Sequence, residues 1–161
     1  MAAIQKISTF LWFNQEAEEA ANLYVPLFKD SKILSVTRYG DAGPGPKGSA
    51  MTVEFQLAGQ KFIALNGGPH FKFTEAISLF VTCDSQEEVD TLWSTLTANG
   101  GQESQCGWLK DKFGLSWQIV PSRFMELMQG KDPKGSQRVM QAMLKMKKFD
   151  IARLEEAYAQ G

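Results

Sequence analysis

The sequence has little of what secreted, fibrous or membrane proteins depend on. Its 161 residues include two cysteines, one histidine and six prolines. Two cysteines are too few for a disulfide framework, and a chain of this length buries enough surface to fold without disulfides or a structural metal. No apolar run approaches the roughly 20 residues of a membrane span, and the N-terminus lacks the pattern of a secretion signal. We therefore expect a cytoplasmic protein with no membrane partner, in which Cys83 and Cys106 are reduced thiols.

Charge of neither sign dominates. Lysine and arginine number 17 against 18 aspartates and glutamates, which leaves a net charge of -1. Such a chain has no global field to draw it onto nucleic acid, so no nucleic-acid partner is expected. Hydrophobic residues make up 43% and charged residues 22%, the composition of an ordinary globular protein. One domain, or two small fused halves, is the expectation.

Two segments of the chain share the pattern of a strand followed by an amphipathic helix. The apolar residues 4–13 are followed by Asn14, which favours a helix that begins at Asn14 or Gln15 and ends near Pro26. A capping box of Ser85 and Glu88 predicts the second helix. The apolar positions of the two helices are Ala17, Ala20, Ala21, Tyr24, Leu27 and Phe28, and Val89, Leu92, Trp93 and Leu96.

A constant offset of 69 residues superposes these two segments. It takes Ala20 to Val89 and residues 7–13 to residues 76–82. Amphipathic helices often agree by chance, so the match of the strands is what favours an internal duplication.

Further strands complete each half. They are predicted at KILSVTRYG, MTVEFQL, QKFIALN, ESQCGWLK and LSWQIVP. Each half then reads as a strand, a helix and two or three antiparallel strands, which predicts an α+β fold with modules at residues 1–68 and 74–121. Alternation in these strands places one sheet face on the helices and leaves the other to line a cavity. Residues 122–161 are predicted to be a helical tail, with Asp132 and Asp150 as N-caps.

Residues 43–48 spell G-x-G-x-x-G, the pattern of a dinucleotide site. That site needs a helix N-terminus after the glycines, whereas here two prolines remove donors and the strand at residues 51–57 follows. We interpret the segment as a mobile loop between strands that is able to cover a cavity.

His70, the single histidine, lies in a loop between the halves. One histidine cannot form a two-histidine metal site, and the spacing of Glu54, Glu75 and Glu103 matches no metal motif. A surface-loop histidine is the favoured interpretation, with a ligand-contacting general base as the alternative.

The tail holds five of the seven methionines. These are Met125, Met128, Met140, Met143 and Met146. They either pack the tail helices on the body, the favoured interpretation, or form an adaptable surface for a ligand or partner.

Several segments resemble one family. They are ISTFLWFNQEAEEAANLY, VEFQLAGQKFIALNGGP, ISLFVTCDSQEEVDTLW and above all CGWLKDKFGLSWQIVP. They are similar to the PhnB-like branch of the glyoxalase, bleomycin-resistance and extradiol-dioxygenase superfamily, the vicinal oxygen chelate fold. The resemblance implies a single glyoxalase-like domain over residues 1–161, built from paired βαβββ modules around a pocket, and a homodimer.

Metal enzymes of that superfamily have ligands at positions that correspond here to Ile7 or Ser8, Ala64, Ala76 and Gln118. Of these, only Gln118 carries a plausible donor, and metals need several donors that converge. Members of the branch often carry the label 3-demethylubiquinone-9 3-methyltransferase, but no glycine-rich turn between a parallel strand and a helix supports methyl transfer here. We expect no metal, no cofactor and no carried-over catalytic residues.

The sequence thus favours a metal-free protein that binds a small organic molecule, with an enzyme or an interaction module that acts through the Met-rich tail as alternatives. Catalysis is left open, with binding alone preferred. The pocket candidates are Trp12, Glu54, His70, Ser78, Phe80, Trp108, Ser116 and Gln118.

Overall fold

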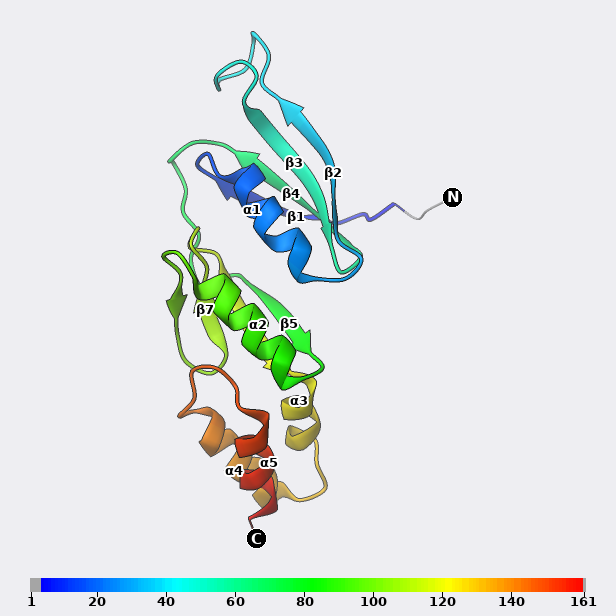
Figure 1. The fold of residues 1–161 in the computed structure, drawn as a ribbon, viewed down its shortest axis with the longest axis vertical. Helices are drawn as coiled ribbons and strands as arrows, with labels where there is room; N and C mark the ends of the chain where they lie inside the picture. The colour runs from blue at the N-terminus through cyan, green and yellow to red at the C-terminus, as the bar shows by residue number, and fades with distance from the viewer. Residues whose placement is uncertain (1–3, 161) are drawn as a thin grey trace. The chain divides into compact units, whose positions relative to one another are not determined.

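The computed structural model describes residues 4–160 and consists of two compact units, one up to residue 72 and one from residue 73 (Figure 1). In the first unit the elements are β1 (Thr9–Phe13), α1 (Ala17–Tyr24), the 3-10 helix η1 (Val25–Leu27), β2 (Lys32–Arg38), β3 (Ala50–Leu57) and β4 (Gln60–Asn66). The sheet order is β1-β4-β3-β2, with β1 parallel to β4 and the other pairs antiparallel.

The second unit repeats this arrangement and adds a tail. Its elements are β5 (Ser78–Cys83), α2 (Gln86–Thr97), β6 (Gln102–Glu103), β7 (Trp108–Lys110), β8 (Ser116–Pro121), α3 (Ser122–Met128), α4 (Pro133–Met143) and α5 (Ile151–Ala159). The order β5-β8-β7-β6 again pairs the first and last strands of the module in parallel. The α+β fold of two βαβββ modules with a helical tail is therefore confirmed. Among the described residues, every helix is too short or too polar to cross a membrane.

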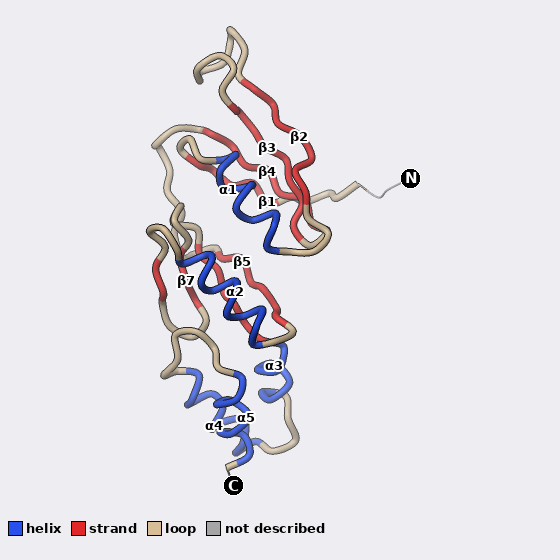
Figure 2. Tube along the Cα trace, in the orientation of Figure 1, coloured by secondary structure: helices blue, strands red, loops and turns tan. Residues whose placement is uncertain are grey.

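Each module has one helix along one face of its sheet (Figure 2). In the first, Ala17, Ala20, Ala21 and Tyr24 are fully buried against the sheet. The predicted start of this helix is wrong by two or three residues, and Asn14 is not its cap. The backbone N–H of Ala17 instead donates to the side-chain oxygen of Asn66 at 2.8 Å, so a residue of β4 caps the helix.

The local signals for the other helices are confirmed. The Glu88 N–H donates to the Ser85 hydroxyl at 3.1 Å at the start of α2, and the Glu88 carboxylate accepts from the Asp84 N–H. Asp132 and Asp150 cap α4 and α5 through their side chains.

The offset of 69 is wrong for the strands. Leu11 and Phe13 are buried toward α1, and their counterparts by pairing are Val81 and Cys83, which gives an offset of 70. The buried positions of the two helices match at an offset of 72, because the first buried helix residue lies six residues after the strand end in the second module, from Cys83 to Val89, and four in the first, from Phe13 to Ala17. A shift of one residue exchanges the two faces of a strand, so this correction decides which side chains face the helix.

The predicted strand ESQCGWLK is broken into β6 and β7. Cys106 and Gly107 between them have φ of 59° and 83°. Their N–H groups donate to the carbonyls of Met146 and Lys147, both at 2.8 Å, which ties this loop to the tail.

The tail folds back on its own module. Val120 of β8 lies in a buried cluster with residues of all three tail helices and of the segment before α5: Leu127, Val139, Met146, Phe149 and Leu154. Met128 and Met143 pack against this cluster, whereas Met125, Met140 and Leu144 are exposed. Three of the five tail methionines, Met128, Met143 and Met146, therefore pack the tail on its module.

Both cysteines are free thiols, as predicted. Cys83 is fully buried, and this burial raises its pKa to about 12, with Glu88 and Asp84 adding to the effect. Its thiol stays protonated at neutral pH and has the character of a core residue.

Asp111 organises the hairpin between β7 and β8. Its carboxylate is buried and accepts hydrogen bonds from the N–H groups of Phe113 and Leu115 and from the indole N–H of Trp117, at 2.9, 3.1 and 2.9 Å. These bonds fix the turn and the central strand β8 together.

We expect Asp111→Ala to lower the free energy of unfolding by about 3 kcal/mol, since three donors lose a charged acceptor in a buried site. Urea denaturation followed by tryptophan fluorescence measures this. The matched control is Asp41→Ala, which removes an exposed carboxylate and should change stability by less than about 0.5 kcal/mol. Equal effects of the two substitutions would contradict this role of Asp111.

Candidate functional site

Five of the predicted pocket residues lie together on the open face of the second sheet, away from α2. They are Ser78, Phe80, Trp108, Ser116 and Gln118. Gln118 is central, because Phe80 on β5 and Trp108 on β7 are its neighbours on either side in the strand register. Its side-chain N–H donates to the Ser78 hydroxyl at 3.0 Å. A polar centre is thus flanked by two aromatic rings, of which Phe80 is 51% exposed.

Ser116 is next to this centre, opposite Ser78 on one side and Lys110 on the other. It is fully buried, and within residues 4–160 its hydroxyl has no hydrogen-bond partner. Lys110 forms an ion pair with Glu75, and its hydrogen bond to that carboxylate lowers the pKa of Glu75.

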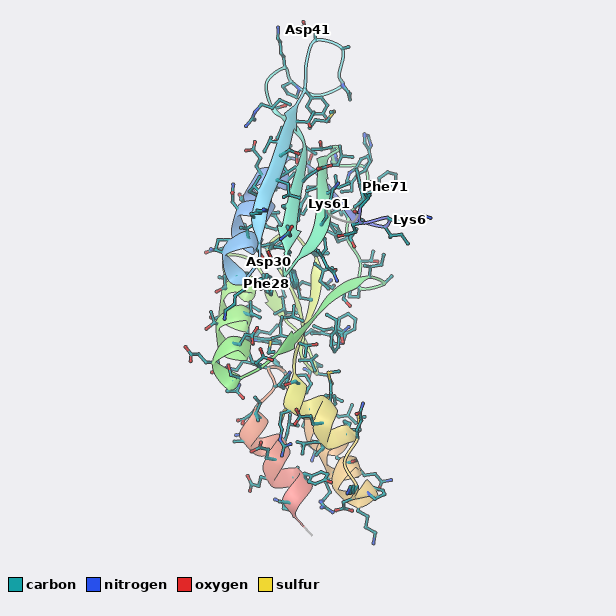
Figure 3. All side chains as sticks on the ribbon, turned by 90° about the vertical axis from the view of Figure 1, so that its right-hand side faces the viewer. Lys6, Phe28, Asp30, Asp41, Lys61 and Phe71 are labelled. Atoms are coloured by element: carbon teal, nitrogen blue, oxygen red, sulfur yellow. The ribbon has the colours of Figure 1, made fainter. Side chains whose placement is uncertain are left out.

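The open face of the first sheet carries two further candidates, Trp12 and Glu54. The indole N–H of Trp12 donates to the Gly68 carbonyl at 2.9 Å, and Phe71 meets its ring edge-on. Glu54 pairs at 3.4 Å with Lys61, which is labelled in Figure 3. The two candidates are engaged in separate local contacts and form no joint cluster.

The remaining candidate, His70, lines a cavity of about 580 Å³ at one end of the first sheet. The cavity walls come from the start of α1, the ends of β2 and β4, the start of β3, and the loops at residues 44–46 and 67–70. Sequence reasoning missed Glu18, Arg38, Tyr39 and Asn66, which also line it.

Glycines shape two walls of this cavity. A Cβ at Gly43 or Gly45 would overlap the ring of Tyr39, so the loop after β2 packs on that ring only because both residues lack a side chain. Gly67 packs in the same way on Trp12. The tip of the loop, with Asp41, projects beyond the strands (Figure 3). The predicted loop between strands is confirmed for residues 43–48, and two glycines of the motif serve packing.

Asn66 links three walls of the cavity. Its side-chain oxygen accepts from Ala17, its side-chain N–H donates to the Ala50 carbonyl at 3.1 Å, and its own carbonyl accepts from the Tyr39 hydroxyl at 2.7 Å. The start of α1, the start of β3 and the end of β2 are therefore held to β4 by one residue.

The positions that correspond to metal ligands in the superfamily do not fit a metal. Ala64 is fully buried on the helix-facing side of β4, and its neighbours Ile63 and Leu65 on the open face are hydrocarbon. Among the described residues, no group of three histidine, cysteine, aspartate or glutamate side chains is placed to hold a metal ion.

We expect Asn66→Ala to lower the free energy of unfolding by about 2 kcal/mol, because the Ala17 N–H and the Ala50 carbonyl lose their partners. Thermal and urea unfolding measure this. Gln56→Ala, which removes an amide bonded to Asp30 at an exposed site, is the control and should have a smaller effect. If both substitutions have the same small effect, Asn66 does not hold the cavity walls together.

Comparison with known proteins identifies the family. The family model of 3-demethylubiquinone-9 3-methyltransferase matches residues 5–120. One similar structure is from Bacillus cereus and is described as a putative 3-demethylubiquinone-9 3-methyltransferase, PhnB protein. Its sequence is 41% identical, and its TM-score is 0.68. The match covers 73% of this chain and 99% of that one. Protein PA1353 of Pseudomonas aeruginosa, at 21% identity, shares the fold with a TM-score of 0.60 over 74% of this chain and 98% of its own. No curated protein matches the sequence. The chain thus belongs to the 3-demethylubiquinone-9 3-methyltransferase family, with its PhnB-like members.

Proposed function

We propose that this protein binds a small organic molecule, without a metal, on the open face of its second sheet. The observation that carries the proposal is the position of Gln118 between Phe80 and Trp108, with its amide hydrogen-bonded to the neighbouring Ser78. A few converging polar groups with aromatic walls are the usual composition of a small-molecule site.

Gln118 supports a polar ligand group at this place, because its amide has a second N–H and an oxygen beyond the bond to Ser78. Ser116 beside it is fully buried, so its hydroxyl, which has no partner within residues 4–160, does not reach the open face. The amide of Gln118 favours a ligand that presents hydrogen-bonding groups rather than a purely apolar one.

Methyl transfer is the second candidate function, favoured by the description of the family. The residues of this chain give it less support. The glycine-rich segment connects the antiparallel strands β2 and β3, whereas the binding site for a methyl donor ordinarily uses a turn from a parallel strand into a helix.

The binding proposal is tested with untagged protein in a thermal-shift screen of small organic molecules that includes S-adenosylmethionine, followed by calorimetry of the hits and metal analysis of the sample. We expect a hit whose affinity falls at least tenfold in Gln118→Leu. Gln56→Leu, which changes a glutamine on the other sheet, should leave the affinity unchanged.

Two results would overturn the binding proposal. One is a stoichiometric metal that is retained on gel filtration and lost in Gln118→Leu, and the other is a hit that is insensitive to Gln118. Binding of S-adenosylmethionine at the same face would favour the methyltransferase alternative.

A homodimer is part of the proposal, supported by the outer strands β1 and β5. At the end of its sheet, each has a free edge within the described units. Equivalent apolar residues are exposed on both strands and just before them: Phe10 and Phe80 at 53% and 51%, and the preceding Ile7 and Ile77 at 85% and 68%. Free edges with exposed apolar side chains are normally covered by a partner, and a second copy supplies the same surface.

We expect the protein to have twice the mass of 17.9 kDa in light scattering at micromolar concentration. Phe10→Asp should shift it toward the monomer mass, because a charge would be buried at the edge. Leu144→Asp on the tail is the control, since this exposed residue lies outside the sheets. A monomeric parent protein, or a dimer lost only in Leu144→Asp, would refute the edge as the interface.

We also propose that the protein is cytoplasmic. Its two free thiols, one of them fully buried, are consistent with a reducing compartment.

A further inference from the structure

The cavity of the first unit shares no lining residue with the site proposed above on the second sheet. Its volume of about 580 Å³ is within the range of small-ligand sites. Its walls are fixed by the hydrogen bonds of Asn66 and by the close packing of glycines on Tyr39 and Trp12. A cavity with walls held in this way is pre-formed, which lowers the cost of binding.

Arg38 is the charged residue that gives this cavity its chemistry. Its Nη1 donates to a Glu18 carboxylate oxygen at 3.2 Å and to the Gly48 carbonyl at 3.3 Å. Within residues 4–160, neither Nε nor Nη2 donates a hydrogen bond. Glu18 therefore orients the guanidinium and leaves one edge of it, with two parallel donors, unused.

That unused edge matches one class of ligand group. The Nε and Nη2 donors of arginine bind the two oxygens of a carboxylate in a bidentate pair, which is stronger and more directional than a single bond. Glu18 is the one lining carboxylate, and it pairs with Nη1 at the other side of the guanidinium.

The other lining side chains fit the rest of a small ligand. The side chains of Asn14, Gln15 and His70 line the cavity, and none of them has a hydrogen-bond partner in the described part of the chain. The ring of Tyr39 and the prolines at positions 44 and 46 add apolar surface. The lining thus combines the guanidinium of Arg38, neutral polar groups and a small apolar surface.

We propose that this cavity binds a small organic carboxylate, whose carboxylate group pairs with the free Nε and Nη2 edge of Arg38. His70, Asn14 and Gln15 hydrogen-bond to polar substituents of the ligand, and Pro44 and Pro46 pack on its carbon skeleton. The inference does not depend on binding at the second sheet.

Benzoate and its neutral isostere benzamide are the probes, titrated into the ¹⁵N-labelled full chain and followed by two-dimensional NMR. Benzoate should produce saturable shifts of the amide signals of Gly45, Gly67 and Gly68 and of the Arg38 side-chain Nε–H. Benzamide, which lacks the charge, should bind at least tenfold more weakly. Shifts that do not saturate, or equal binding of the two probes, would refute the proposal.

Matched variants test whether Arg38 binds the carboxylate group. Arg38→Lys keeps the charge but removes the paired Nε and Nη2 donors, so the affinity for benzoate should fall at least tenfold. Arg153→Lys on the tail should leave that affinity unchanged. Glu18→Gln removes the nearby negative charge and should tighten benzoate a few-fold without changing benzamide, a result that remains decisive if Arg38→Lys folds poorly. Unchanged benzoate binding in both Arg38→Lys and Glu18→Gln would overturn the assignment.

Gln118→Leu distinguishes this site from the one on the second sheet. Benzoate binding should be unchanged in that variant. If Gln118→Leu abolishes the benzoate shifts at Gly67 and Gly68, the cavity is not an independent site and this inference fails.

Discussion

Each sheet is covered on one face by the helix of its own module and is largely open on the other, where the tail packs on Val120 at the end of β8, and this constraint decides where the polar side chains of the sheets lie. Val53 and Phe55 are buried under α1, while Glu54 between them faces the other way. A half-covered sheet leaves its second face for a ligand or a partner. The polar centre at Gln118 and the exposed ring of Phe80 both lie on such an uncovered face.

Alternation within a strand was enough to predict which residues share a face. Ser78, Ser116 and Gln118 lie together as expected, because the period of two is a local property. The exact correspondence of residues between the two modules could not be predicted from the sequence. Matching the helices at 69 displaces them by about one turn from the observed 72, and it leaves the strands, which correspond at 70, one residue out of register with their faces exchanged. Ala64, assigned to a ligand position, is buried under α1 for a related reason: neighbouring residues on a strand face opposite ways.

The residues of the cavity could not be found from local patterns, because they meet only through strand pairing. Tyr39 follows β2 and Asn66 ends β4, yet the two are hydrogen-bonded across the width of β3. The one sequence signal is the pair Gly43 and Gly45 shortly after Tyr39, since glycines that lie against an aromatic ring indicate close packing. Arg38 and Glu18, 20 residues apart, have no such signal.

The end of the last strand explains why the two modules differ. Asn66 in β4 corresponds to Pro121 in β8, since their parallel partners Phe13 and Cys83 are equivalent. In the first module the side chain of Asn66 caps α1, because Glu16 at the N-cap position makes no side-chain cap. The second helix is capped by its own Ser85, so no cap is needed from Pro121, the residue equivalent to Asn66. Pro121, which has no N–H to donate, instead leads directly into α3 and the tail. One module therefore uses this end to build a cavity, and the other uses it to extend its core.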